Sequence, residues 1–124
     1  MEKIAKKILV IEDEHDLTTA YWVRLTNLGY KVEFAYDGLE ALEKLKHFRP
    51  DLIVLDLLLP RLDGFKFLEA MKADSNTSQL PVIVVTVRDD PADKKRCTDM
   101  GVIDFIIKTD VSLEQLVNKI QSYL

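Results

Sequence analysis

The chain has little of the chemistry that cross-links small domains or anchors them in membranes. Its single cysteine, Cys97, excludes an internal disulfide bond. With only His15 and His47 beside that cysteine, the chain offers no Cys/His spacing for a zinc site. No apolar run approaches the ~18 residues of a membrane span, and the N-terminal MEKIAKK lacks the apolar stretch of a signal peptide. We therefore expect a cytoplasmic protein without a membrane anchor.

An excess of basic residues is also missing. The 17 lysines and arginines are outnumbered by 21 aspartates and glutamates, for a formal net charge of -4. A chain with this balance has no basic footprint for DNA or RNA, so direct nucleic-acid binding is not expected. The 124 residues, 48% of them hydrophobic, suffice for one ordinary hydrophobic core. We expect residues 1–124 to form a single domain. Its composition is compatible with binding a hard cation or with phosphate chemistry.

Hydrophobic patterning predicts strands that alternate with helices. The apolar runs at 8–11, 52–55 and 82–85 have no polar alternation, which is typical of parallel strands buried on both faces of a sheet. The run at 31–34 alternates polar and apolar residues, and a polar residue interrupts the run at 102–107, so both indicate edge strands. Amphipathic stretches predict five helices, near 17–28, 38–46, 64–73, 91–100 and 113–124.

Glycine and proline positions agree with this division. Gly29 and Gly101 directly follow helical patterns, where a left-handed cap conformation costs glycine little, and Pro91 suits a first helical turn. Strands that alternate with helices of about 10 to 15 residues imply right-handed crossovers and a mostly parallel sheet. The sequence thus predicts a three-layer α/β fold, a doubly wound (βα)5 parallel sheet of five strands.

Residues with reactive side chains directly follow four of the predicted strands. In open parallel sheets, ligands bind outside the carboxyl ends of the strands. If the first and third strands are neighbours, about 4.8 Å apart, Glu12, Asp13 and Asp56 converge in one pocket. Carboxylates so close together repel one another unless a cation lies among them, and Mg²⁺ is the simplest such cation. Thr86 follows the fourth run and Lys108 the fifth.

This set of residues suits phosphoryl transfer. An aspartate beside a divalent metal, a hydroxyl and a lysine can act as a nucleophile toward phosphorus. The metal and the ammonium of Lys108 would neutralise charge on the oxygens of a transferring phosphoryl group, and Thr86 could hydrogen-bond one of those oxygens. The residues therefore predict a protein that accepts a phosphoryl group on Asp56 and releases it by hydrolysis at the same site.

Four motifs, each at the end of a predicted strand, resemble the response-regulator receiver domain of two-component signalling over essentially the whole chain. The resemblance is to chemotaxis-regulator-like receivers and implies a flavodoxin-like sheet with strand order 2-1-3-4-5. The motifs are ILVIEDE at 8–14, DLLLPRLDG at 56–64, VT at 85–86 and DFIIK at 104–108.

The same resemblance implies a role for each matched residue. Asp56 matches the phosphoacceptor. Glu12 and Asp13 match the acidic pair that holds Mg²⁺, with Asp13 as the direct metal ligand. Leu58 would give its backbone carbonyl to the metal, which Asp56 also ligates. Lys108 matches the lysine that binds the phosphoryl group.

The resemblance also implies a signalling switch. Thr86 matches the switch hydroxyl, and Phe105 matches the aromatic that turns inward when that hydroxyl moves toward the phosphoryl group. Such a protein is not an enzyme beyond catalysing its own phosphorylation and dephosphorylation. A sensor histidine kinase or phosphotransfer protein would donate the phosphoryl group. A downstream protein, or a second copy of the chain, would bind the face formed by residues 91–124, whose last strand is unusually apolar for an edge.

Two positions depart from the family pattern. Relatives usually follow the lysine with a cis proline, but here Thr109 stands there, and a non-proline cis bond costs about 3 kcal/mol. Either the fold stabilises a cis Lys108–Thr109 bond, or the loop runs trans and aims Lys108 differently; we favour trans. The second departure is Val87, where relatives usually have a small residue; its bulk is expected to slow entry of a phosphodonor or of attacking water.

Other interpretations of these residues stay open at this point. The acidic residues at 12–16 could simply favour a helix N-terminus, Asp56 could close a turn, and Phe105 could belong to the core. An aspartyl-phosphate phosphatase or mutase would want a second acid where Leu58 stands. A flavin binder would want a Ser/Thr/Gly-rich phosphate loop after the first strand, where this chain has three acids. A receiver that is never phosphorylated is supported only by Thr109.

Overall fold

The computed structural model describes residues 4–124, which form a five-stranded sheet with five α-helices. Strands and helices alternate along the chain as the hydrophobic pattern predicts. A short 3-10 helix, η1 (Lys108–Asp110), follows the last strand. The strands are β1 (Lys7–Ile11), β2 (Lys31–Ala35), β3 (Leu52–Leu55), β4 (Val82–Thr86) and β5 (Asp104–Ile107). The helices are α1 (His15–Asn27), α2 (Gly38–Lys44), α3 (Gly64–Ala73), α4 (Pro91–Asp99) and α5 (Leu113–Ser122).

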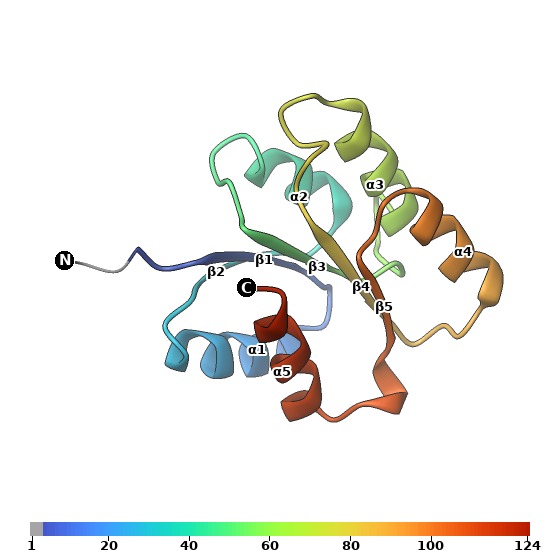
Figure 1. The fold of residues 1–124 in the computed structure, drawn as a ribbon. Coiled ribbons are helices and arrows are strands. Elements are labelled where there is room, and N and C mark those ends of the chain that lie inside the picture. The colour runs from blue at the N-terminus through green and yellow to red at the C-terminus, as the bar shows by residue number, and fades with distance from the viewer. Residues whose placement is uncertain (1–3) are drawn as a thin grey trace.

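All strand pairs are parallel, and the strand order is β2-β1-β3-β4-β5 (Figure 1). This order confirms the predicted doubly wound, flavodoxin-like sheet, with β2 and β5 at its edges. The chain leaves β1 toward one edge and returns on the other side of β1 to form β3. The carboxyl ends of β1 and β3 are therefore the point where the winding reverses, which is where ligands bind in such sheets.

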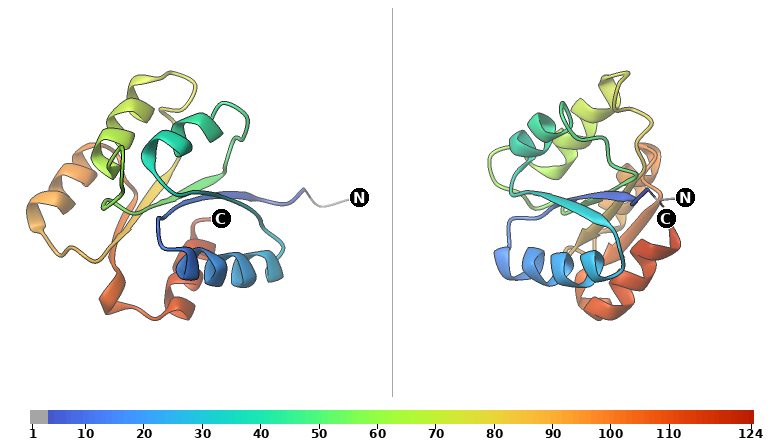
Figure 2. Two further views of the ribbon diagram at one scale, coloured as in Figure 1. Left: turned by 180° about the vertical axis from the view of Figure 1, so that it is seen from behind. Right: turned by 90° about the vertical axis from the view of Figure 1, so that its left-hand side faces the viewer.

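Helices cover both faces of the sheet, which makes three layers (Figures 1 and 2). α1 and α5 pack on one face, and α2, α3 and α4 pack on the other. Each central strand contributes side chains to the hydrophobic clusters on both faces of the sheet, because successive side chains point to opposite faces. In β1, for example, Ile8 and Val10 belong to the α1/α5 cluster, and Leu9 and Ile11 belong to the α2/α3/α4 cluster.

Some boundaries differ from the sequence prediction. The last strand begins at Asp104 rather than at 102, because the turn after α4 still includes Val102, whose amide donates to the Cys97 carbonyl. Gly101 takes the left-handed conformation there, with φ 85°, as its position predicts. Thr86 is the last residue of β4 rather than the first residue after it, because it pairs with Ile107 of β5. Among residues 4–124, no helix has the length and apolar character to cross a bilayer.

Candidate functional site

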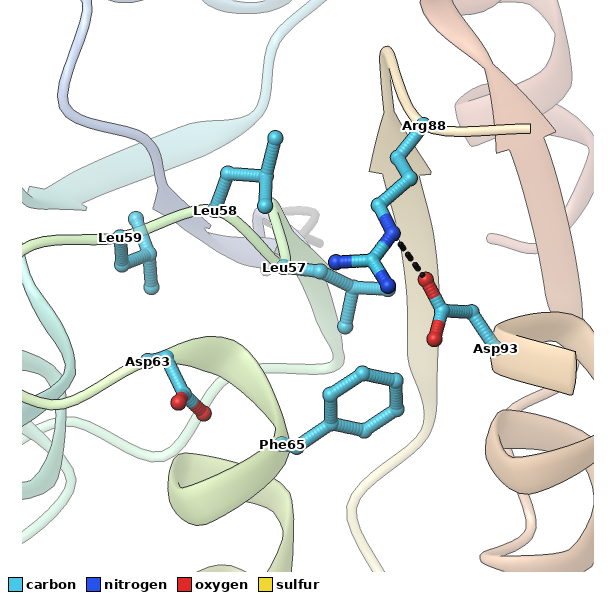
Figure 3. Close-up of a pocket in the computed structure, with 7 residues that line it drawn as sticks. All are labelled: Leu57, Leu58, Leu59, Asp63, Phe65, Arg88 and Asp93. Carbon is cyan, nitrogen blue, oxygen red and sulfur yellow. Dashed lines mark ion pairs between the residues drawn. The ribbon is translucent and has the colours of Figure 1, made fainter. Parts of the chain in front are cut away.

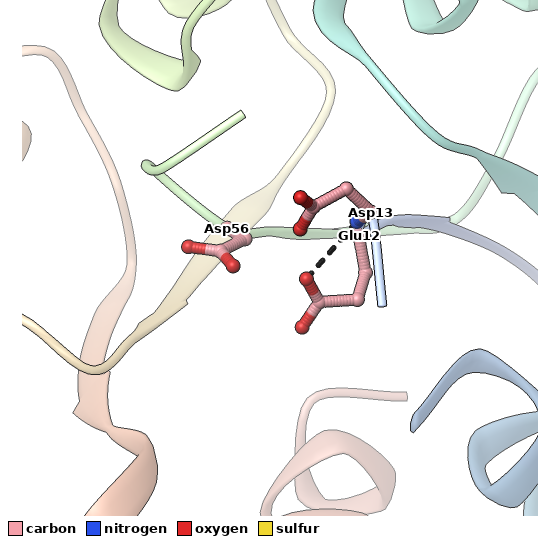
Figure 4. Close-up of side chains that lie close together, drawn as sticks. All are labelled: Glu12, Asp13 and Asp56. Carbon is pink, nitrogen blue, oxygen red and sulfur yellow. Dashed lines mark hydrogen bonds between the residues drawn. The ribbon is translucent and has the colours of Figure 1, made fainter. Parts of the chain in front are cut away.

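The strand register brings three carboxylates together at the carboxyl end of the sheet. Ile11 pairs with Leu55, so Glu12 and Asp56 leave neighbouring strands at the same level. The Asp56 amide donates to the Ile11 carbonyl, which fixes this arrangement. One oxygen each from Glu12, Asp13 and Asp56 lie within 4.8 Å of one another (Figure 4). The structure therefore places the predicted acidic residues in one cluster.

Lys108 reaches the same cluster from β5. Because Thr86 pairs with Ile107, Lys108 follows directly at the carboxyl end of β5 and begins η1. Its Nζ donates to Asp56 Oδ2 at 3.0 Å and also to Glu12 Oε1. Residues 4–124 contain no cis peptide bond, so the Lys108–Thr109 bond is trans, as we favoured. We paired a trans loop with a differently aimed Lys108, but in the structure the trans loop still brings the Lys108 ammonium to Asp56.

Burial distinguishes the three acids. Glu12 and Asp56 are only 3% and 7% exposed, whereas Asp13 is exposed to solvent. The pKa of Glu12 is raised to about 7: burial is the largest cause, the hydrogen bond from Lys108 lowers it, and Asp56 raises it. Burial alone would lower the pKa of Lys108, but its hydrogen bonds and the charges of the two acids raise it overall. Lys108 is therefore held as a cation beside a carboxylate that burial tends to protonate.

Tyr21 of α1 lies beneath this cluster and is fully buried. Burial, followed by the negative charges of Glu12 and Asp56, raises the pKa of its phenol well above the usual range. The phenol thus stays neutral and adds no negative charge beside the acids. The pattern that predicts a helix near 17–28 gives no signal of this proximity.

The donor set fits a hard divalent cation. Three carboxylates face one ammonium, which leaves negative charge uncompensated, and carboxylate oxygens are the ligands that Mg²⁺ takes in proteins. Leu58 lies beside them, because its amide donates to Asp56 Oδ1 at 3.0 Å. The alternative that these acids simply favour the N-terminus of α1 accounts for Asp16 in its first turn, but not for the meeting of Glu12 and Asp13 with Asp56.

Thr86 and Phe105 lie on the adjacent strands β4 and β5. Thr86 is fully buried, and its Oγ1 accepts a hydrogen bond from the Arg88 amide at 3.3 Å. Phe105 is half-buried and packs against the core, so the structure shows the core contact that was one of its two interpretations. Val87 is 53% exposed and continues the β4–α4 loop. The switch roles of Thr86 and Phe105 remain predictions.

A surface cavity of about 340 Å³ opens next to Leu58 (Figure 3). Arg88 lies across it and pairs with Asp93 of α4, with 2.9 Å between Nε and Oδ2. Asp93 is 8% exposed, whereas the Arg88 side chain is 53% exposed, so only the acidic partner of this ion pair is buried. Neither residue had been singled out from the sequence, because an arginine and an aspartate five residues apart across a loop and a helix start have no periodic signature.

Known proteins match both the sequence and the fold. The family model described as the response regulator receiver domain matches residues 8–121. The response regulator MprA of Mycobacterium ulcerans is 36% identical over 118 residues, which cover 95% of this chain and 50% of MprA. The chain thus spans about half the length of the curated relatives it matches.

Two solved structures extend the likeness to three dimensions. Vibrio cholerae chemotaxis protein CheY4 superposes with a TM-score of 0.87 at 29% identity, covering 98% of this chain and all of that one. The receiver domain of sensor histidine kinase PA1611 from Pseudomonas aeruginosa has a TM-score of 0.82 at 28% identity, covering 97% and 98% of the two chains. That structure has a magnesium ion coordinated in its active-site cleft. With the strand order, the acidic cluster and the family match in agreement, the chain belongs to the response-regulator receiver domains of two-component signalling.

Proposed function

We propose that Asp56 accepts a phosphoryl group from a sensor histidine kinase or a phosphotransfer protein in a Mg²⁺-dependent reaction. One observation carries the proposal: a buried aspartate lies 3.0 Å from a lysine ammonium and close to two further carboxylates. A nucleophile for phosphorus, a fixed cation and a set of metal ligands thus share one pocket.

Each residue has a distinct task in the proposed transfer. An Asp56 carboxylate oxygen forms the bond to phosphorus while the bond between phosphorus and the donor's histidine nitrogen breaks, and that nitrogen keeps the electron pair. Lys108 lies where it can neutralise charge on the phosphoryl oxygens. The metal would be held by Asp13, Asp56 and the Leu58 carbonyl. Glu12 would contribute the negative charge of its buried carboxylate. When bound, Mg²⁺ supplies positive charge against the transferring phosphoryl group.

The phosphoryl group would be read out through Thr86. Its hydroxyl oxygen now accepts a hydrogen bond from the Arg88 amide. A charged phosphoryl oxygen on Asp56 would be a strong acceptor to which the same hydroxyl can donate. Movement of Thr86 toward Asp56 would free space beside β5 into which Phe105 can pack. We propose that this shifts the population of conformations of the 91–124 face.

The 91–124 face is the proposed site for a downstream protein or a second copy of the chain. Ile103 and Tyr123 are 46% and 41% exposed on it. Asp104 at the start of β5 accepts from Tyr123 and Lys119 of α5, which ties the strand to the helix. A change at β5 would therefore be transmitted to α5. In this proposal residues 1–124 act as one domain, in the cytoplasm, without direct contact to nucleic acid or membrane.

The competing functions find less support. Leu58, which stands where a phosphatase or mutase would need its second acid, is apolar and 46% exposed. The acidic cluster would repel the phosphate of a flavin. Since Lys108 contacts Asp56 despite Thr109, the one argument for a receiver that is never phosphorylated is also weakened.

Incubation with Mg²⁺ and acetyl phosphate, followed by intact mass measurement, tests the proposal. We expect a gain of one phosphoryl group that requires Mg²⁺ and is absent in Asp56→Ala. Asp51→Ala is the matched control, because Asp51 stands at the other end of the same strand. Phosphate on a serine or threonine, or none at all, would refute the assignment of Asp56.

A further inference from the structure

The loop that follows Asp56 also contacts a segment of the chain that does not belong to the acidic cluster. Residues 56–63 connect β3 to α3 and carry Leu58. The junction between β2 and α2 contacts this loop through Asp37 and Gly38. The Gly38 amide donates to the Leu62 carbonyl at 3.1 Å, and Asp37 Oδ2 lies 3.4 Å from Arg61 Nε.

The contact at Gly38 requires glycine. A Cβ built at this position would lie 2.2 Å from the Leu62 carbonyl oxygen and 2.9 Å from the Leu62 Cβ. Backbone atoms cannot move aside as a flexible side chain can, so any side chain here would push the loop away. The absence of a side chain at Gly38 therefore allows the β3–α3 loop to lie in its observed position.

Arg61 adds a second fixed point. Between residues 4 and 124 it is the one non-glycine residue with positive φ, at 63°, a conformation that side chains disfavour. Its partner Asp37 is only 7% exposed, and the other oxygen of that carboxylate caps α2 by accepting from the Glu40 amide. The ion pair therefore joins a strained loop residue to a carboxylate that is itself held in place by a helix.

The other end of the loop is equally constrained. The Gly64 amide donates to the Leu57 carbonyl at 3.0 Å, and a Cβ at Gly64 would lie 2.6 Å from the Leu57 Cα. Leu58 lies between Leu57 and Leu62, the two loop residues held by these contacts, and its amide donates a hydrogen bond to Asp56. Its backbone has little freedom to shift unless one of the contacts gives way.

We propose that Asp37, Gly38 and Arg61 are positioning residues for the metal site: they hold the β3–α3 loop so that the Leu58 backbone meets the same cation as Asp13 and Asp56. The inference rests on the proposed function, because it needs a cation at that cluster. Groups that orient metal ligands without touching the metal typically change its affinity about 10- to 100-fold. The effect should appear in Mg²⁺ affinity rather than in the chemistry at saturating Mg²⁺.

Calorimetric titration of Mg²⁺ into the full chain, followed by acetyl phosphate labelling at varied Mg²⁺, tests this. We expect Gly38→Ala to weaken Mg²⁺ binding about tenfold while labelling at saturating Mg²⁺ approaches the wild-type rate. Gly29→Ala is the matched control: it replaces a glycine of φ 93° that ends α1, with nothing within 4 Å of the added Cβ. If Gly38→Ala does not fold, Asp37→Asn takes its place, because asparagine caps a helix as well as aspartate but removes the ion pair.

The outcomes separate the two proposals. Weaker Mg²⁺ binding in Gly38→Ala or Asp37→Asn, with Gly29→Ala like the wild type, supports the positioning role. Wild-type affinity in folded Gly38→Ala or Asp37→Asn overturns that role and leaves the proposed function intact. Equal weakening in Gly29→Ala overturns it as well, because general destabilisation then explains the loss. A wild-type chain that binds no Mg²⁺ overturns the proposed function and the positioning role with it.

Discussion

Two aspartates at opposite ends of β3 illustrate how position decides what a carboxylate can do. Asp51, just before the strand, is exposed and accepts the Lys7 amide at 2.7 Å. Asp56, just after it, is buried among Glu12, Asp13 and Lys108. The first is satisfied by a backbone amide and is open to solvent. The second depends on other charges, so perturbing those charges should affect the Asp56 end of the sheet and leave the Asp51 end unchanged.

Removal of the ammonium should have the largest effect. Lys108→Met is expected to slow phosphorylation of Asp56 by acetyl phosphate about 100- to 1,000-fold, the usual cost of losing a charge-stabilising donor. Time-resolved intact mass measures the rate. Lys119→Met is the matched control, because Lys119 also pairs with an aspartate, Asp104 at 3.3 Å, but at the start of β5 rather than at its carboxyl end. Similar rates in Lys108→Met and wild type would show that the ammonium is not part of the reaction.

The buried carboxylate at Glu12 should make stability depend on pH. Its folded pKa of about 7 exceeds the ordinary 4.5, so the folded protein keeps a proton that the unfolded chain releases. Without metal, the free energy of unfolding should therefore fall as pH rises between about 4.5 and 7, by up to about 3 kcal/mol at 1.36 kcal/mol per pKa unit. Urea unfolding at pH 5 and pH 8 measures this.

Glu12→Gln provides the comparison for that measurement. The neutral amide cannot titrate, so the fall between pH 5 and pH 8 should largely disappear in this variant. A wild-type protein whose stability rises over the same interval would contradict the assignment of the high pKa to Glu12.

Mg²⁺ should stabilise the fold by binding only the assembled cluster. At a free concentration of about 100 times its Kd, a ligand specific for the folded state adds about 2.7 kcal/mol to the free energy of unfolding. Thermal unfolding with and without Mg²⁺ measures the gain. Asp13→Asn should lose most of it, and Asp16→Asn, an exposed acid in the first turn of α1, should keep it. Equal gains in both variants would exclude Asp13 as a metal ligand.

The smallest expected effect concerns access to the pocket. Val87 is half-exposed next to Thr86, and Val87→Ala should shorten the half-life of the phosphorylated protein severalfold by admitting water more easily. Ile103→Ala, which truncates another half-exposed side chain away from Asp56, is the control. Identical half-lives in Val87→Ala and wild type would remove the idea that Val87 shields the pocket.

Much of this fold could be predicted from the pattern of apolar residues. The buried runs of β1, β3 and β4 and the alternating run of β2 mark the centre and one edge of the sheet, and the structure confirms them. The boundaries of β5 and Thr86 could not be placed, because strand ends depend on which partner offers a hydrogen bond. The sequence could not show the Arg88–Asp93 pair or the Asp37–Arg61 pair, because each joins segments through a conformation that no periodic pattern encodes.

By itself the sequence determined which charged and hydroxyl side chains lie near the carboxyl ends of the strands, since the apolar runs stop there. It also determined the parallel architecture, because uninterrupted apolar strands must be covered on both faces. Only the tertiary structure decided that Lys108 contacts Asp56 without a cis bond, that Asp13 is exposed while Glu12 is buried, and that α2 holds the loop after Asp56. The reason is physical: these features arise from distances between segments that are remote along the chain, and the register of the sheet sets those distances.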